Sequence, residues 1–229
     1  MEWMPFNPID CFPHCGCEPF IPWLVVRQPW AFISSLAYFA IGYLLHLQGK
    51  KRGVSLKGLP FLMCLVGTTS MFAHSSLSKL AMAMDYSSII FLITFFPVMD
   101  IVTRTFFKRI PLGLLLPAYY IFLVVSLLPF KLMQQYWIAS AFFTLGLVHI
   151  YRKRGPFFIL ERKVMISFIL LGVSVGFMFL DQNEWFCGLK FIPYGHTLWH
   201  IGSGISMYIF WHWYFFETNT QLESESSKI

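Results

Sequence analysis

The chain has 229 residues, of which 57% are hydrophobic and 12% are charged, and its mean hydropathy is +0.62. A soluble domain carries about 25% charged residues, so this composition excludes a water-soluble globular protein and a disordered chain. It favours one membrane domain over residues 1–229. The 26 Phe and 8 Trp residues suit contact with lipid tails and headgroups.

Seven apolar stretches are close to the length of a membrane-spanning helix, about 20 residues. In chain order they are Trp30–Leu47, Leu59–Leu77, Ser87–Thr103, Pro111–Leu128, Met133–Tyr151, Val164–Leu180 and His196–Phe216. The strands of a membrane β-barrel alternate polar and apolar residues, and these stretches do not. We therefore predict an all-α integral membrane protein, a seven-transmembrane helix bundle. The segment 1–29 lacks a signal-peptide pattern, so the first helix is expected to direct insertion.

The positive charges indicate the orientation, because Lys and Arg gather in cytoplasmic loops. If the N-terminus is outside, every Lys and Arg is cytoplasmic except Arg27, Lys79, Lys131 and Lys190. We therefore predict an outer segment 1–29 and a cytoplasmic tail, 217–229. The net charge of +6 then reflects topology, and no nucleic-acid-binding stripe is present. A bacterial inner membrane and a eukaryotic secretory-pathway membrane both remain open, as does the oligomeric state.

Three histidines are placed where a metal site requires them. His74 lies in the outer half of the second predicted helix, and His196 and His200 open the seventh helix on the same side. His196 and His200 are four residues apart and therefore share one helix face. Three histidines and a water molecule are a ligand set of catalytic zinc. The pattern favours Zn²⁺, and the alternative is packing and hydrogen bonding.

Two polar residues add a possible catalytic function. Ser70 is one turn from His74 on the same face. Asp85 follows a predicted hairpin near Lys79, which returns the chain to the level of His74. A carboxylate beside a metal-bound water is what hydrolysis requires. The alternatives are a hydroxyl bonded to a backbone carbonyl for Ser70 and a helix cap for Asp85.

The sixth predicted helix carries two further features. Gly172-x-x-x-Gly176 predicts close helix packing. Asp181 lies just past the end of the helix, where a solvated loop charge is the usual interpretation. The alternative places Asp181 behind the metal ligands as a supporting residue.

The motif Ser70-x-x-x-His74, then Asp85, then His196-Thr-Leu-Trp-His200, resembles the alkaline ceramidases. These belong to the CREST superfamily of seven-helix membrane hydrolases, which also includes the progestin and adipoQ receptors and Per1-like proteins. The resemblance extends over nearly the whole chain. It also includes Cys17-Glu18-Pro19, Gln28-Pro29, Ser34-Ser35-Leu36-Ala37-Tyr38 and the stretch from Asp181 to Cys187.

The resemblance implies zinc on the three histidines and catalytic roles for Ser70 and Asp85. It implies amide hydrolysis of ceramide, an N-acyl sphingoid lipid, to a sphingoid base and a fatty acid, within sphingolipid metabolism. Animal alkaline ceramidases also bind calcium near the N-terminus. Calcium needs about six to eight oxygen ligands, and Asp10 and Glu18 alone are too few, so no calcium site is predicted.

The cysteines allow two interpretations. Cys17 and Cys187 fall on the outer side, where disulfides persist. That shared side and the family resemblance together imply a bridge between them, which would pin the N-terminal segment over the mouth of the bundle. A second zinc site at Cys11, His14, Cys15 and Cys17 is the alternative, but the tight Cys-Gly-Cys is a poor tetrahedral clip.

Three other function classes remain open. One is a receptor-like protein of the same superfamily with structural zinc, and another is a hydrolase of ester lipids or phospholipids. The third is a haem protein, but His196 and His200 share a face and cannot bracket one haem. Ser70 and Asp85 favour the enzyme, because a structural zinc site does not need them.

Overall fold

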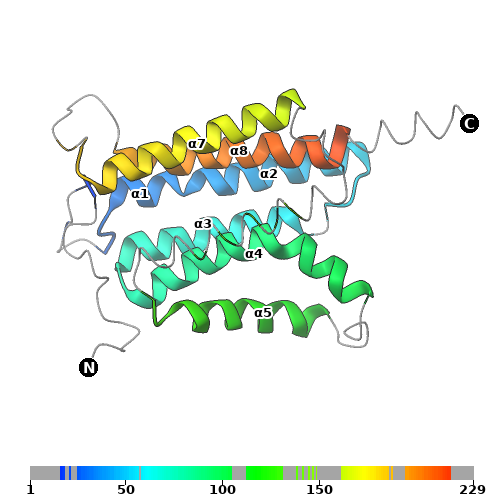
Figure 1. The fold of residues 1–229 in the computed structure, drawn as a ribbon, viewed down its shortest axis with the longest axis horizontal. Coiled ribbons are helices and arrows are strands. Elements are labelled where there is room, and N and C mark those ends of the chain that lie inside the picture. The colour runs from blue at the N-terminus through cyan, green and yellow to red at the C-terminus, as the bar shows by residue number, and fades with distance from the viewer. Residues whose placement is uncertain are drawn as a thin grey trace, which may run out of the picture.

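The computed structural model describes residues 16–18, 21, 25–56, 58–104, 112–130, 138, 141, 144, 146, 148, 161–185, 187 and 194–217. Every regular element within these ranges is a helix, which confirms the all-α prediction. Figure 1 shows the helices lying roughly side by side along one axis. The predicted fifth span, Met133–Tyr151, lies almost entirely outside the described residues.

Most helix boundaries lie close to those of the predicted spans, but the first span, predicted as Trp30–Leu47, forms two helices and extends to Arg52. In chain order they are α1 (Pro29–Ser34), α2 (Leu36–Arg52), α3 (Leu59–Ser76), α4 (Lys79–Arg104), α5 (Leu112–Leu127), α7 (Arg162–Gln182), α8 (Gly195–His212) and the π-helical turn η3 (Trp213–Glu217). Two of these stretches are long and apolar enough to cross a membrane, Pro29–Arg52 and Arg162–Gln182.

The largest difference is in α4, which begins at Lys79 and not at the predicted Ser87. Its first residues include Lys, Leu, Ala and Met, which are strong helix formers, although their hydropathy is lower than that of the rest of the span. Ser78 caps this end, because its hydroxyl accepts the amide of Ala81 at 3.3 Å. Asp85 therefore lies inside α4, and its interpretation as a helix cap is wrong.

The core forms where α2, α3, α4 and α8 pack together, around side chains such as Leu45, Met63 and Ile90 that are fully buried. Gly67 permits the close approach of α3 to Ser35 and to the start of α2. A methyl group there would meet the ring of Phe39 and the carbonyl of Ser35. This close packing brings Ser35 against the face of α3 that carries Ser70.

Helices α7 and α8 pack through small polar residues. The hydroxyls of Ser167 and Ser206 each donate to the other residue's carbonyl, at 2.9 and 2.8 Å. Gly172 and Gly176 have a different environment from the predicted one. No atom of the described residues lies within 4 Å of a methyl group placed at either glycine, so the expected close packing is not found in this part of the chain.

Large apolar side chains cover the outer faces of α5 and α7. Phe122 of α5 and Ile169 of α7 are each 63% exposed, and Phe179 is 56% exposed. Soluble monomers rarely expose contiguous apolar surface of this kind. This surface is suited to contact with lipid.

Candidate metal centre

Three histidines meet at one end of the bundle. His74 comes from the last part of α3, and His196 and His200 come from the first turns of α8. Their ring centroids are 4.7 to 5.1 Å apart, and one candidate ligand atom from each lies within 4.8 Å of the others. His74 and His200 are buried and His196 is half-buried. Such a cluster could hold a metal ion.

The hydrogen bond of His74 determines which ring nitrogen is available. Its Nδ1 lies 2.9 Å from the side-chain oxygen of Gln28. An amide oxygen only accepts hydrogen bonds, so Nδ1 carries the proton and donates it. The Nε2 atom then has a free lone pair, and this buried atom has no hydrogen-bond partner among the described residues. A lone pair in this position suits a metal ligand.

His200 follows the same pattern. Its Nδ1 lies 3.0 Å from the carbonyl oxygen of Ala31 and 2.8 Å from the hydroxyl of Ser34. The carbonyl only accepts, and the Ser34 hydroxyl already donates to that carbonyl at 2.9 Å. Nδ1 therefore donates, and the lone pair is again on Nε2. Metal-binding histidines are held in this way by a partner on the second ring nitrogen.

The residues of the cluster therefore fit a zinc ion. Zinc accepts neutral imidazole nitrogens, and a catalytic site leaves its fourth position for water or substrate. Two of the three rings are held in the tautomer that this requires. Gln28, Ala31 and Ser34, which hold them, were not predicted from the sequence as parts of the site.

Ser70 lies next to this cluster. Its Oγ is 3.3 Å from Nε2 of His200 and 3.0 Å from the hydroxyl oxygen of Ser35. The Ser35 hydroxyl also lies 2.9 Å from the carbonyl oxygen of Ala31, which only accepts hydrogen bonds. The Ser70 hydroxyl therefore lies on the side of His200 on which a metal would bind.

The helix register places Asp85 near the same depth. The Thr69 hydroxyl of α3 donates to the Ser88 hydroxyl of α4 at 2.8 Å, which aligns the two helices. Asp85 lies three residues from Ser88 in the direction of the hairpin, or about 4.5 Å along the helix. This level is between those of Ser70 and His74. The carboxylate is buried, and its Oδ1 has no hydrogen-bond partner among the described residues.

Asp181 supports the backbone at the start of α8. Its Oδ1 accepts the amide of Gly195 at 2.8 Å, and the amides of Cys17 and His196 also hydrogen-bond to this buried carboxylate. A negative charge is favourable at a helix N-terminus. Asp181 is therefore not a solvated loop charge. It holds the first turn of α8, the helix that carries His196 and His200.

A disulfide joins Cys17 to Cys187, the pair that the resemblance implies. Glu18 follows directly and is buried, and its carboxylate accepts the amides of Trp30 at 2.6 Å and Ala31 at 3.0 Å. These are amides of the first turn of α1, so Glu18 caps this helix. The disulfide thus places the cap, and the capped turn presents the carbonyl of Ala31 to His200.

Glu18 predicts a pH dependence of stability. Burial raises the pKa of Glu18 from 4.5 to about 7, although the hydrogen bonds from Trp30 and Ala31 lower it. The folded state therefore binds this proton more tightly than the unfolded chain does. Glu18 favours folding most below pH 4.5, and this contribution to stability is lost as the pH rises through about 7. We expect Glu18→Gln to reduce the fall in melting temperature over this range. Equal pH profiles for both proteins would contradict this account.

The hydrogen bond between Gln28 and His74 is expected to strengthen metal binding. Replacing Gln28 with leucine removes the acceptor for Nδ1 of His74, and we expect zinc affinity to fall about 10- to 100-fold. Gln28→Glu retains an acceptor for Nδ1 of His74 and should keep most of the wild-type zinc affinity. Competition with a chelator of known affinity measures both variants. Wild-type affinity in the leucine variant would show that Gln28 does not hold the ligand.

Of the sequence-predicted residues, the structure gathers His74, His196, His200 and Ser70 and places Asp181 behind them. No protein-family model matches the chain, and no curated protein is significantly similar to it. The disulfide uses Cys17, so the alternative zinc site that required the Cys17 thiolate is wrong as a four-residue site. Cys11, His14, Cys15 and Asp10 lie outside the described residues, so the expectation that there is no calcium site stays a prediction.

Proposed function

We propose that the chain is a multi-pass membrane protein that hydrolyses the amide bond of ceramide-like lipids with a zinc ion bound to His74, His196 and His200. The observation that carries the proposal is the histidine cluster, in which Gln28 and Ala31 keep Nε2 of His74 and His200 available for a metal. The resemblance to the alkaline ceramidases supplies the substrate class.

Three observations support the membrane placement. Two helical stretches are long and apolar enough to span a bilayer. The faces of α5 and α7 expose large apolar side chains. Lys and Arg concentrate on one side of the seven predicted spans, which favours an outer N-terminus and places the histidines near the non-cytoplasmic face.

The reaction requires a nucleophile, a proton carrier and a group that stabilises the oxyanion. His74, His196 and His200 would hold the zinc ion, which would lower the pKa of a water molecule towards about 7 and polarise a carbonyl group. Asp85 is the base that takes the proton of the attacking water and passes it to the leaving amine. The Ser70 hydroxyl donates a hydrogen bond to the amide oxygen as negative charge develops there. The products are a sphingoid base and a fatty acid.

Metal removal and a substrate panel test the proposal. The full chain is purified in a mild detergent, treated with a chelator and supplied with zinc or magnesium. We expect release of fatty acid from ceramide to stop on chelation and to return with zinc only. Matched ester lipids and phospholipids serve as competing substrates. Zinc binding without turnover of any lipid would favour a receptor-like protein, and faster ester cleavage would exclude a dedicated amidase.

A further inference from the structure

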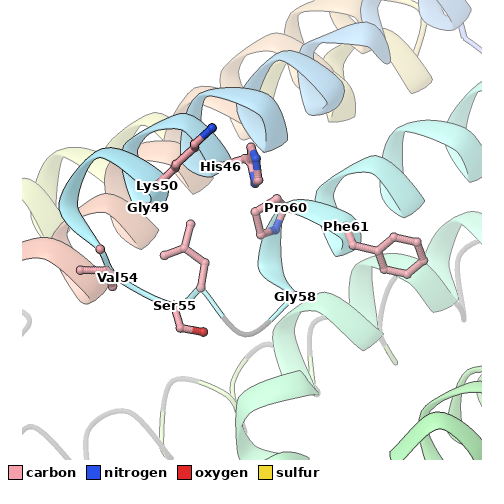
Figure 2. A pocket seen from close by; sticks show the side chains of 10 residues that line it. His46, Gly49, Lys50, Val54, Ser55, Gly58, Pro60 and Phe61 are labelled. Atoms are coloured by element: carbon pink, nitrogen blue, oxygen red, sulfur yellow. The ribbon is translucent and has the colours of Figure 1, made fainter.

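A cavity of about 610 Å³ lies between the end of α2 and the start of α3. Figure 2 shows this region, with His46 of α2 across from Pro60 of α3. Pro60 is fourteen residues from His74 on the same helix, which corresponds to about 21 Å. The cavity is therefore at the other end of the helix from the metal centre.

The cavity carries positive charge. His46 and Lys50 are four residues apart on α2, so they share a face, and both line the cavity. Lys51 and Arg52 follow directly at the end of the helix. None of the described residues that line the cavity is acidic. The side chains therefore favour an anionic ligand.

The two helix ends at this cavity add to the effect of the side chains. Two of the last carbonyls of α2 accept hydrogen bonds, because Gly53 turns into the left-handed conformation with φ of 64°. This turn lets the amide of Gly53 bond to the carbonyl of Lys50 and the amide of Val54 bond to that of Gly49. Helix α3 begins at Leu59, after Gly58, without a side-chain cap. The amide of Leu59 donates to the carbonyl of Leu56 and Pro60 has no amide proton, so this positive helix end adds only a small contribution to the basic side chains.

The remaining wall of the cavity is apolar. Leu56, Pro60 and Phe61 contribute to it, and Phe61 is 70% exposed. On the adjacent helix α2, Tyr43 is 62% exposed. A ligand that joins an anionic group to apolar chains matches both parts of this surface. Anionic phospholipids have this chemistry, and they attract basic residues at the cytoplasmic face of a membrane.

We propose that this cavity binds the anionic head group of a phospholipid. Lys50 and His46 contact its phosphate, and the acyl chains lie along the exposed apolar surface that begins at Phe61. The site depends on the membrane placement proposed above and not on hydrolysis. It is also separate from the substrate site, which is at the histidine cluster.

Native mass spectrometry of the full chain tests this site. The protein in a non-ionic detergent is titrated with dioleoyl phosphatidylglycerol and, for comparison, dioleoyl phosphatidylcholine. We expect tighter binding of phosphatidylglycerol and about a fivefold loss of that affinity in Lys50→Gln. Lys51→Gln is the matched control, because adjacent residues on a helix point in different directions. It should lose clearly less affinity.

Three results would overturn the proposal. One is equal binding of the two lipids, and another is equal loss in Lys50→Gln and Lys51→Gln, which would indicate diffuse charge attraction. The third is displacement of the lipid by millimolar inorganic phosphate, which would indicate a site for a free ion. Zinc content measured on the same samples reports on the metal centre separately, so failure at one site is distinguishable from failure at the other.

Discussion

Replacing His200 with alanine is expected to remove bound zinc and to reduce fatty-acid release from ceramide below detection. His200 is one of three proposed ligands, and its Nδ1 is held by the carbonyl of Ala31 and the hydroxyl of Ser34. A wild-type sample should contain about one zinc per chain, the stoichiometry of a single three-histidine site. Metal analysis and turnover are measured on the same preparation.

The control for this variant is His212→Ala, on the same helix. His212 is twelve residues from His200, or about 18 Å along α8, and its ring packs against Tyr208 and Phe216. It should keep both zinc and activity. If His200→Ala retains its zinc and its activity, the cluster is a packing arrangement, and the proposed function is wrong.

Asp85→Asn is expected to retain zinc and to reduce turnover by about 10²- to 10⁴-fold, the usual contribution of a positioned acid or base. Asparagine has nearly the same shape as aspartate but accepts no proton at neutral pH. The buried Oδ1, which has no hydrogen-bond partner among the described residues, is the atom that this substitution tests. Single-turnover measurements with saturating ceramide separate the chemical step from lipid binding.

Glu184→Gln provides the matched control, because it neutralises an exposed carboxylate just after the C-terminal end of α7. It should leave turnover unchanged. Full activity in Asp85→Asn would refute the assignment of Asp85 as the base. Ser70 would then be the remaining polar candidate beside the histidine cluster. Loss of zinc in Asp85→Asn would instead indicate that this carboxylate helps to hold the metal.

The sequence was sufficient to predict the helical class and the histidine cluster. The four-residue spacing of His196 and His200 places both on one face of any helix, whatever surrounds it. The depth of His74 followed from the alternating direction of the spans. The predicted start of α4 was wrong because the prediction followed hydropathy. Lys79 and its neighbours form a helix because of their helix propensity and the Ser78 cap.

The residues that support the ligands could not be predicted in the same way. Gln28 and Ala31 reach His74 and His200 across tertiary contacts, and neither position shows a periodic signal. The sequence favours a solvated loop charge for Asp181, because its hydrogen-bond partners are backbone amides and no sequence pattern indicates them. The environment of Gly172 and Gly176 depends on packing, and a small-residue motif cannot specify whether a partner lies beside it.

The position of the metal ligands in the chain has a consequence for biosynthesis. Two of the three histidines belong to α8, and the disulfide that fixes the first segment joins residues separated by 170 positions. During translation, the helices before α8 are made while two of the three histidines have not yet been synthesised. Loading of the proposed metal is therefore expected to be a late event, and a nascent chain released before α8 is synthesised would contain one of the three candidate ligands.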